Sequence, residues 1–525
     1  MGEGAPYEPS FNLWNQPWIA LERPDGAVER RGIEGAILES HEFTTVYEVT
    51  PLAVAAIHRL LVAVVQAALR PERNADLEGL WSSGRFPAER VRAFGDQYRH
   101  RFDVFSEEEP FLQTADLPRR PTEDTKTKSV AYLSVDIPAG TAVTHYRHGP
   151  EDEQAFCPVC VAAGLVCIPA FATSGGKGIR PSINGVPPIY VLPGGNTLFE
   201  SLAASLLTPA YQPAMASRAK DDAWWERSPV VPRYAEVREV GYLHSLTFPA
   251  RRVRLHPERL GRRCTRCGWN AEWLVRTMIF EMGESRPKSA ELWLDPFAAY
   301  RKPDARSGKA VPTPVRPVAG RAVWREYASL FLQLPAEGRT IRPRVLDQIA
   351  ALDVDNLPER FRCVGLRTDM KAKVFEWLDA GLDVPPGLLR DEGAALRVEQ
   401  GLEFASDCAQ ILSRTFRRYA GRRRPGGQGP GRRSERHGGL QRRVDNQYWS
   451  ALAAPFRDLT TLLASGEEAT AELPWGETVV TTARAAFQRA MDELGDDADS
   501  LRDSETAKKW CAIELARRRK EYLNE

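Results

Sequence analysis

Two Cys-x-x-Cys pairs constrain the fold of this chain more than any other feature of its sequence. The first pair is Cys157 and Cys160 in CPVC, and the second is Cys264 and Cys267 in CTRC. About a hundred residues separate the two pairs, a longer gap than in a compact zinc ribbon. Four thiolates are enough to close a tetrahedral zinc shell that has no open position. A shared ion would therefore hold together two loops that lie far apart in the sequence.

The residues alone leave three interpretations of these cysteines open. The opening stretch MGEGAPYEPS has neither a basic nor an apolar region, so no secretion signal is predicted and a cytoplasmic location is expected. Thiols stay reduced there, and close cysteine pairs in that compartment are more often metal-binding or catalytic than disulfide-bonded. A redox dithiol needs only one pair and leaves the second unexplained. Structural zinc explains both pairs, and unliganded core thiols are the third interpretation.

The first two thirds of the chain predict a mixed α+β domain. Residues 11–23 predict a short strand, and residues 25–33 predict a turn at Asp25 and Gly26 followed by a second strand. The apolar segment 52–70 contains His58, Arg59 and Gln66, which favours a buried helix over a membrane span. Residues 100–345 are rich in Pro and Gly, which is typical of irregular structure with long loops.

The last third predicts a four-helix bundle. Apolar residues recur there at intervals of three and four, which gives each helix one apolar stripe to bury. We place the boundary near residue 390, so that residues 1–390 form the N-terminal domain and residues 391–525 the bundle. The four stripes are Ala395, Val398, Leu402, Ala405, Ala409, Leu412 and Phe416; Tyr448, Leu452, Phe456, Leu459 and Leu463; Val480, Ala483, Phe487, Ala490 and Leu494; and Ala507, Cys511, Leu515 and Tyr522.

An Arg- and Gly-rich segment lies between the first two predicted helices of the bundle. Residues 417–443 hold ten arginines and one acid, Glu435, and their composition cannot form a core. A loop is expected, either as a solvated connection or as an arm that binds phosphates. The formal net charge of the whole chain is only +1, so any contact with nucleic acid must come from local patches of this kind.

A small-residue segment, PAFATSGGKG, follows the first cysteine pair. It lacks the Gly and the Ser or Thr that a phosphate-binding P-loop requires, because Phe171 and Gly178 occupy those positions. Small residues permit a close approach of the backbone to another surface, although a plain Gly-rich turn has the same composition. The HExxH, GxSxG and EF-hand patterns are also missing, so no catalytic residues are predicted.

These features together resemble the large subunit of Cascade, the type I-E CRISPR surveillance complex (the CasA family). The resemblance covers most of the chain. It rests on FNLWNQPWIAL at residues 11–21, the paired cysteine motifs, the small-residue loop, VGLRTDMKAKVFEW at 364–377 and the helical bundle. It implies a non-catalytic subunit that reads the protospacer-adjacent motif of target double-stranded DNA from the minor groove. It also implies a start of duplex unwinding and R-loop formation, partner Cascade subunits with guide RNA, and recruitment of a nuclease-helicase.

The resemblance also implies site residues. The motif-reading loop falls on Ala170, Phe171, Ala172, Thr173, Ser174, Gly175 and Gly176, and the wedge that separates the first base pair falls on Met370, Lys371 and Ala372. Further basic contacts are expected from Arg286, Lys288 and Arg367. A loop facing the interior of the complex is expected at Tyr146, Arg147 and His148, and structural zinc at the four cysteines. Small loops and few cations predict relaxed motif reading, because the minor groove distinguishes little beyond A·T from G·C.

Two other functions remain alternatives at this point. One is a zinc-stapled scaffold subunit that binds RNA or protein without reading DNA. The other is a zinc-containing RNA-modifying enzyme with catalysis in the central loops. A membrane role is not expected.

Overall fold

The computed structural model describes residues 8–134, 153–173, 180–183, 185–215, 221–287, 289–303, 311–334, 340–368, 374–420, 430–493 and 498–524. The chain divides into two compact units. The first consists of Met1–Val318 and Thr340–Leu382, and the second of Ala319–Arg339 and Asp383–Glu525. The second unit therefore includes a segment, Ala319–Arg339, that the sequence prediction placed in the N-terminal domain.

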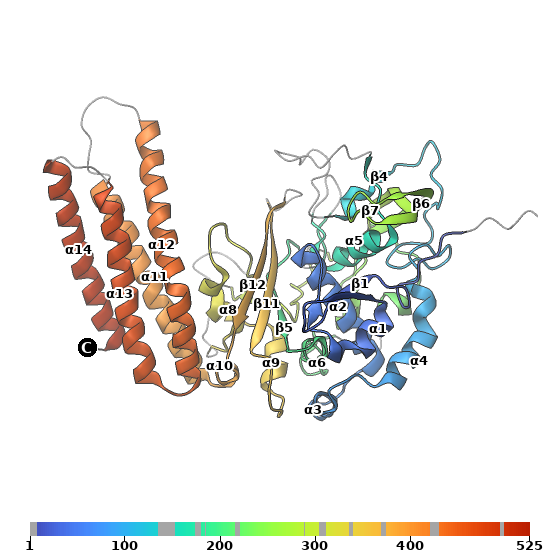
Figure 1. Ribbon diagram of the computed structural model, residues 1–525, viewed down its shortest axis with the longest axis horizontal. Coiled ribbons are helices and arrows are strands. Elements are labelled where there is room, and N and C mark those ends of the chain that lie inside the picture. Colours follow the sequence, from blue (N-terminus) through green and yellow to red (C-terminus); the bar gives the residue numbers. More distant parts are fainter. Residues whose placement is uncertain are drawn as a thin grey trace, which may run out of the picture. The chain divides into compact units, whose positions relative to one another are not determined.

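The first unit mixes short helices with small antiparallel sheets (Figure 1). Its helices are α1 (Ile33–Leu38), α2 (Pro51–Leu69), α3 (Asn74–Ser83), α4 (Ala88–Tyr98), α5 (Pro158–Phe171), α6 (Leu198–Ala203), α7 (Tyr242–Leu246) and α9 (Arg344–Ala350). Its strands are β1 (Ile19–Glu22), β2 (Val28–Arg31), β3 (Thr45–Val46), β4 (Lys128–Ser129), β5 (Tyr190–Gly194), β6 (Arg251–Arg263), β7 (Asn270–Met282), β8 (Tyr300–Arg301), β9 (Thr313–Pro314), β10 (Thr340–Ile341), β11 (Arg360–Thr368) and β12 (Val374–Asp383).

Helix α2 is the core helix of this unit. Thr50 caps its first turn by accepting from the Ala53 N–H at 3.2 Å, and Pro51 occupies the first helical position. The helix is long and apolar enough to cross a membrane, but 94% of its most apolar stretch is buried inside the protein. The prediction of a buried helix is therefore confirmed. One of the helices packed against α2 is α5, which carries the first cysteine pair.

The tryptophans near the start of the chain are core residues. Trp18 is fully buried and donates from Nε1 to the Leu13 carbonyl at 3.1 Å. Trp14 packs against Phe94 and Phe102, with ring centroids 5.7 and 5.6 Å apart. Antiparallel pairing of β1 with β2 confirms the predicted strand, turn and strand.

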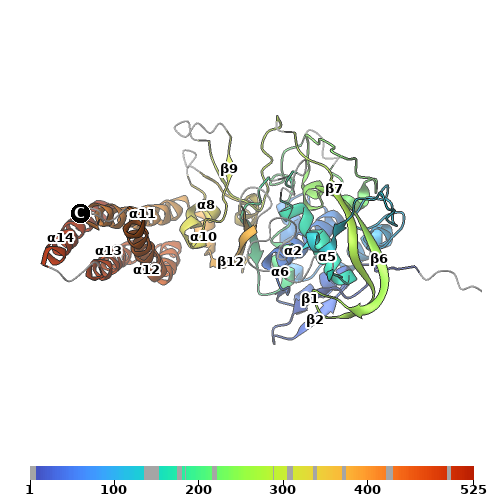
Figure 2. The ribbon, with the colours of Figure 1, turned by 90° about the horizontal axis from the view of Figure 1, so that it is seen from above.

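Two of the sheets position the candidate site. Strands β6 and β7 form a long hairpin (Figure 2). Strand β4 pairs with β7. The open end of the hairpin pairs Arg251 with Met282, and its tip pairs Arg263 with Asn270. The other sheet has the order β12-β11-β5, so that β12 is an edge strand. In that sheet Val364 of β11 lies opposite Tyr190 of β5.

The second unit contains the predicted bundle. Its helices are α8 (Tyr327–Phe331), α10 (Pro386–Arg390), α11 (Glu392–Ala420), α12 (Pro430–Ala464), α13 (Glu468–Asp492) and α14 (Ala498–Leu523). The stripe of α11 is buried throughout, and so is that of α12. Polar side chains lock the helices together: Tyr448 donates to the Ala405 carbonyl at 2.8 Å and Trp475 donates to the Gly401 carbonyl at 3.0 Å.

The segment Ala319–Arg339 contributes to the core of the second unit. Trp324 lies against Phe456 and Trp449, with ring centroids 5.0 and 5.6 Å apart. The guanidinium of Arg325 lies 3.9 Å from the centroid of the Trp449 ring.

The predicted loop of residues 417–443 is shorter than expected. Helix α11 continues to Ala420 and α12 begins at Pro430, so only residues 421–429 lie outside the described chain. Arginine is a good helix former, and Leu440 and Val444 are buried, which lets α12 extend into the Arg-rich segment. The prediction of a long loop was therefore wrong at both ends.

Candidate metal centre and nucleic-acid interface

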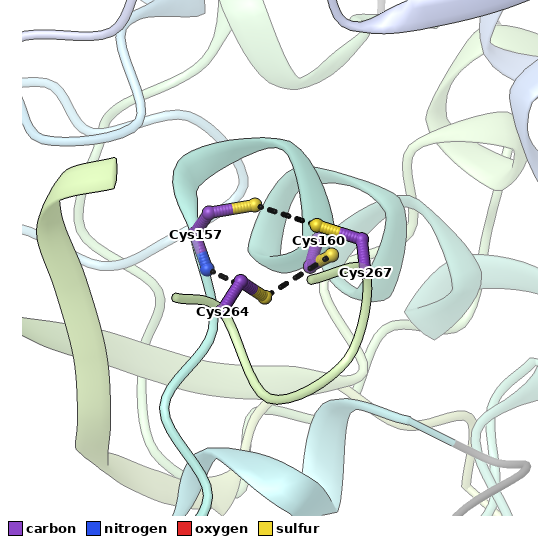
Figure 3. A group of neighbouring side chains, drawn as sticks. All are labelled: Cys157, Cys160, Cys264 and Cys267. Carbon is purple, nitrogen blue, oxygen red and sulfur yellow. Dashed lines mark hydrogen bonds between the residues drawn. The ribbon is translucent and has the colours of Figure 1, made fainter. Parts of the chain in front are cut away.

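Four cysteines from two distant segments meet at one point. Cys157 is the N-cap residue of α5 and Cys160 lies in its first turn, whereas Cys264 and Cys267 belong to the turn between β6 and β7 (Figure 3). Their sulfur atoms all lie within 4.8 Å of one another. Sγ of Cys157 is 3.6 Å from Sγ of Cys267, and Sγ of Cys160 is 3.7 Å from Sγ of Cys264. The predicted meeting of the two pairs is confirmed.

These separations match a tetrahedral metal shell. With a zinc–sulfur distance of about 2.3 Å, the sulfurs of a regular tetrahedron lie about 3.8 Å apart. The backbone also prepares the site, because the Cys157 N–H donates to Sγ of Cys264 at 3.3 Å. Gly268 adopts φ +75° and donates to the Cys264 carbonyl at 3.0 Å, which closes the turn.

The thiols perturb one another strongly. Hydrogen bonding with the Cys157 and Cys160 thiols lowers the pKa of Cys264, and hydrogen bonding with Cys160 lowers the pKa of Cys267 to about 6. The pKa of Cys160 is raised, chiefly by its hydrogen bond with Cys157. A cation that binds all four as thiolates would remove this competition for protons. Four sulfur ligands leave no position for a water or a substrate, so the site suits a structural role.

The remaining cysteines lie elsewhere. Within the described residues they do not join the cluster, although all are buried. They are Cys167 in α5, Cys363 in β11, Cys408 in α11 and Cys511 in α14.

The segment predicted as the motif-reading loop starts with two helical residues. Ala170 and Phe171 are the last residues of α5 and are buried, with exposed fractions of 3% and 0%. The Phe171 ring packs edge-on against Tyr190, whose hydroxyl donates to the Ala170 carbonyl at 3.0 Å. The apolar run of α5 extends through these two positions, so they serve the core. Ala172 and Thr173 are the described residues of the loop, and Ser174, Gly175 and Gly176 lie outside the described residues.

The base of this loop is pinned on both sides. The Ser182 N–H donates to the Ala172 carbonyl at 2.8 Å, and Arg251 donates to the Thr173 carbonyl at 2.5 Å. Burial lowers the pKa of Arg251 to about 10, which still leaves the guanidinium charged at neutral pH. Arg251 sits at the open end of the β6–β7 hairpin, so the strand that leads to the metal site also anchors the loop.

Of the two basic residues predicted after the second cysteine pair, the structure describes Arg286. Arg286 donates to the backbone carbonyls of Glu291 and Arg238, the latter at 3.0 Å, and burial lowers its pKa. Its guanidinium is therefore occupied in holding the chain, and Lys288 lies outside the described residues.

Arg180 is an exposed cation beside this segment that the sequence analysis did not single out. It is exposed at the far end of the small-residue loop, and its side chain lies 3.2 Å from Glu236 and 3.4 Å from Ser285. Its backbone N–H donates to Sδ of Met282 at 3.2 Å. Arg180 thus brings a cation to the segment after the second cysteine pair. The signal for it was the position of an arginine directly after the Gly-rich stretch.

The residues predicted as the wedge cannot be placed, but their neighbours on β11 and β12 can. Met370, Lys371 and Ala372 come between β11 and β12 in the sequence and lie outside the described residues. Arg367 stands at the end of β11, 2.6 Å from Glu376 and 4.8 Å from the centroid of the Phe375 ring. Phe375 and Trp377 of β12 are exposed at 52% and 42%. Tyr146, Arg147 and His148 also lie outside the described residues.

Comparison with known proteins identifies the family of this fold and cysteine arrangement. The family model described as CRISPR-associated protein Cse1 matches residues 12–497. The chain belongs to the Cse1 (CasA) family. The resemblance found in the sequence is thereby confirmed.

Relatives of the Cse1 family match nearly the whole chain. The CRISPR-associated protein CasA/Cse1 of Thermus thermophilus is 29% identical over 518 residues, which cover 94% of each chain. The crystal structure of Cse1 from Acidimicrobium ferrooxidans has a TM-score of 0.80 at 23% identity and covers 98% of this chain and 99% of its own. A chain of a CRISPR RNA-guided surveillance complex has a TM-score of 0.73 at 20% identity and covers 96% and 99%.

Proposed function

We propose that this protein is the non-catalytic DNA-recognition subunit of a type I-E CRISPR RNA-guided surveillance complex in the cytoplasm. It reads the protospacer-adjacent motif from the minor groove, helps to start duplex unwinding and R-loop formation, and recruits a nuclease-helicase. Its partners are target double-stranded DNA, guide RNA and the other Cascade subunits. The observation that carries the proposal is the pinned base of the small-residue loop in a Cse1-family chain.

The pinned base supports minor-groove reading in a specific way. Loop residues without large side chains let the backbone approach the shallow edge of a duplex closely. The hydrogen bonds to the Ala172 and Thr173 carbonyls fix where the loop leaves the protein. Because the backbone of Ala172 and Thr173 is already fixed, less conformational entropy is lost when this segment binds DNA. A segment of small residues can therefore still contribute binding affinity.

Arg180 supplies the cation for this surface in our proposal. Its side chain is 48% exposed, and Glu236 is its carboxylate partner at 3.2 Å. An exposed ion pair of this kind contributes only about 0–1 kcal/mol, so the guanidinium can exchange the carboxylate for a phosphate or a base edge at small cost. Lys371, which follows β11 in the sequence, acts as the wedge, assisted by Met370 and Ala372.

We further propose that the four cysteines hold structural zinc. Zinc supplies no chemistry to a reaction here; it would clamp the start of α5 to the tip of the β6–β7 hairpin. Because α5 leads into the motif-reading loop and β6 begins at Arg251, the clamp orders both elements that define the exit of the loop.

The test is duplex binding by the complex assembled with guide RNA and partner subunits. We expect Arg180→Ala and Lys371→Ala each to weaken binding of a motif-bearing target about tenfold or more, because each variant removes a charge-assisted hydrogen bond to the duplex. The matched control is Arg92→Ala, which removes an exposed arginine from α4. Unchanged binding by both variants would favour a scaffold that does not read DNA through these residues.

A second arm of the same test compares duplexes with every three-base flank. Relaxed reading predicts that several flanks support binding, because A·T and T·A look alike in the minor groove. A strict preference for one flank contradicts this part of the proposal.

A further inference from the structure

The β6–β7 hairpin contains two irregularities, one on each strand. Between Arg259 and Arg262 the strand β6 carries one residue more than its partner, and Gly261 there adopts φ +55°. Between the pairs His256–Thr277 and Pro257–Val275 the extra residue is Arg276 of β7. Such β-bulges bend a strand and redirect side chains, and they are frequent beside functional sites.

Residues at or next to both bulges line the same surface pocket. The pocket has a volume of about 520 Å³ and is lined by Glu153, Gln154, Leu260, Arg262, Thr265 and Arg276. We call it the bulge pocket. One bulge precedes Arg262 and the other is Arg276 itself, so each strand contributes one arginine to a single cavity.

The charge of the hairpin favours an anionic ligand. Residues 258–276 contain five arginines and two glutamates. Arg259 is paired with Glu272 at 2.7 Å, and Arg276 lies 3.9 Å from Glu258. Within the described part of the chain the exposed Arg262 has no carboxylate partner. Glu153 in the pocket and Glu258 beside Arg276 oppose an anion, so the excess positive charge comes from the hairpin as a whole and, in the described chain, from the unpaired Arg262.

The tip of the hairpin adds an exposed aromatic ring. Trp269 follows the second cysteine pair and is 50% exposed, while its carbonyl accepts from the Cys264 N–H at 2.8 Å. Proteins that bind single-stranded nucleic acid combine arginines along the backbone with aromatic rings on which bases stack. Arginine is suited to the phosphates because its planar fork donates two parallel hydrogen bonds.

The bulge pocket is distinct from the motif-reading surface. Thr173 and Arg251 lie at the open end of the hairpin, whereas Arg262 lies near its tip. At about 3.3 Å per residue, the strand between Arg251 and Arg262 spans roughly 35 Å. A ligand of the bulge pocket is therefore bound well away from the loop that we assign to the motif.

We propose that the bulge pocket binds the phosphodiester backbone of a single-stranded nucleic acid, with Arg262 and Arg276 as the phosphate contacts and Trp269 as a stacking ring. This site goes beyond the reading of the motif, and its failure would leave the proposed function untouched.

The experiment measures binding of the full chain to labelled oligouridylate RNA, oligothymidylate DNA and a DNA duplex by fluorescence anisotropy. We expect the double variant Arg262→Ala/Arg276→Ala to weaken single-strand binding at least tenfold. The slope of log affinity against log salt should fall by about 0.7 for each phosphate that the variant no longer neutralises. If the double variant weakens binding of oligouridylate, the ligand is RNA; if it weakens binding of oligothymidylate, the ligand is single-stranded DNA. Either result supports the site.

The matched control is Arg259→Ala/Arg263→Ala, which removes the same charge from the same hairpin without touching the pocket. Equal loss in both double variants means that charge alone binds and overturns the proposal. No loss, or loss only for the duplex or for an acidic protein partner, overturns it as well. Arg262→Glu, an exposed single change that leaves the fold intact, must weaken single-strand binding by itself.

Discussion

The backbone N–H of Cys157 lies 3.3 Å from Sγ of Cys264. This contact joins the start of α5 to the turn of the β6–β7 hairpin, which are 107 positions apart in the chain. The same two elements also hold Thr173, because α5 leads into it and Arg251 of β6 donates to its carbonyl. The metal site and the candidate DNA-reading surface are therefore consecutive parts of one structure, which leads to the following predictions.

Removing one ligand should abolish metal binding. Cys264→Ser should reduce zinc, measured by plasma mass spectrometry, from one ion per chain to none. The thermal transition of the variant should also fall, because structural zinc contributes on the order of 10 kcal/mol in zinc-finger peptides. Cys167→Ala is the control, since Cys167 lies in the same helix outside the cluster. Equal zinc in both variants would contradict the assignment.

Arg251→Met should loosen the base of the motif-reading loop. The change removes the donor to the Thr173 carbonyl, and removal of a charge-assisted hydrogen bond of about 1.5–3 kcal/mol corresponds to faster local opening by tenfold or more. Hydrogen exchange at the Ser182 amide, which bonds to the Ala172 carbonyl, reports this opening. Arg254→Met is the matched control, because Arg254 is buried on the same strand but donates to Glu107. Equal rates in the two variants would speak against the anchoring role.

Asp295→Ala should destabilise the first unit by about 3–5 kcal/mol, because it leaves the Arg59 guanidinium buried without its partner. The two side chains are 4% and 0% exposed and form two hydrogen bonds of 2.9 and 3.2 Å. The exposed pair of Arg259 and Glu272, whose side chains are 65% and 46% exposed, is the comparison, and Glu272→Ala should cost only about 0–1 kcal/mol. Chemical denaturation measures both losses, and similar values would refute the argument from burial.

His58 should make the protein less stable in mild acid. Burial, with the charges of Arg59 and Arg362, lowers the pKa of His58 to about 3, whereas the unfolded chain titrates near 6.5. Between these values the unfolded state binds more protons, so stability falls as the pH falls through 6.5. From pH 7.5 to 5.0 the wild type should lose about 2 kcal/mol more than His58→Gln, which can still donate to Ser205. Identical losses in urea denaturation would show that His58 is not buried neutral.

The sequence predicted the structure best in two cases: where apolar residues recur along one helix, and where a metal shell requires four thiolates. The periodic apolar residues from Ala395 to Phe416 specify one buried face, and the structure buries all of them. The cysteine pairs could be matched because four thiolates complete one shell. The exact end of α5 was missed, since Ala170 and Phe171 suit a loop as well as a helix until Tyr190 packs against them.

Long-range contacts could not be predicted from the sequence. Nothing near Arg251 indicates that it reaches the Thr173 carbonyl, because the contact depends on how the β6–β7 hairpin meets α5. The bulges at Leu260–Gly261 and Arg276 depend on the register of two strands, and only Gly261 hinted at one of them. The backbone partners of Arg286 and the exposed position of Arg180 likewise depend on contacts between distant segments.

The most direct test is a structure of the protein within the assembled complex, bound to guide RNA and to a target duplex that carries the motif. We expect the minor groove of the motif to lie against the backbone of Ala172, Thr173 and the following residues, with Arg180 within hydrogen-bond distance of the DNA. A duplex seated elsewhere on the protein, with this loop remote from every nucleotide, would contradict the account.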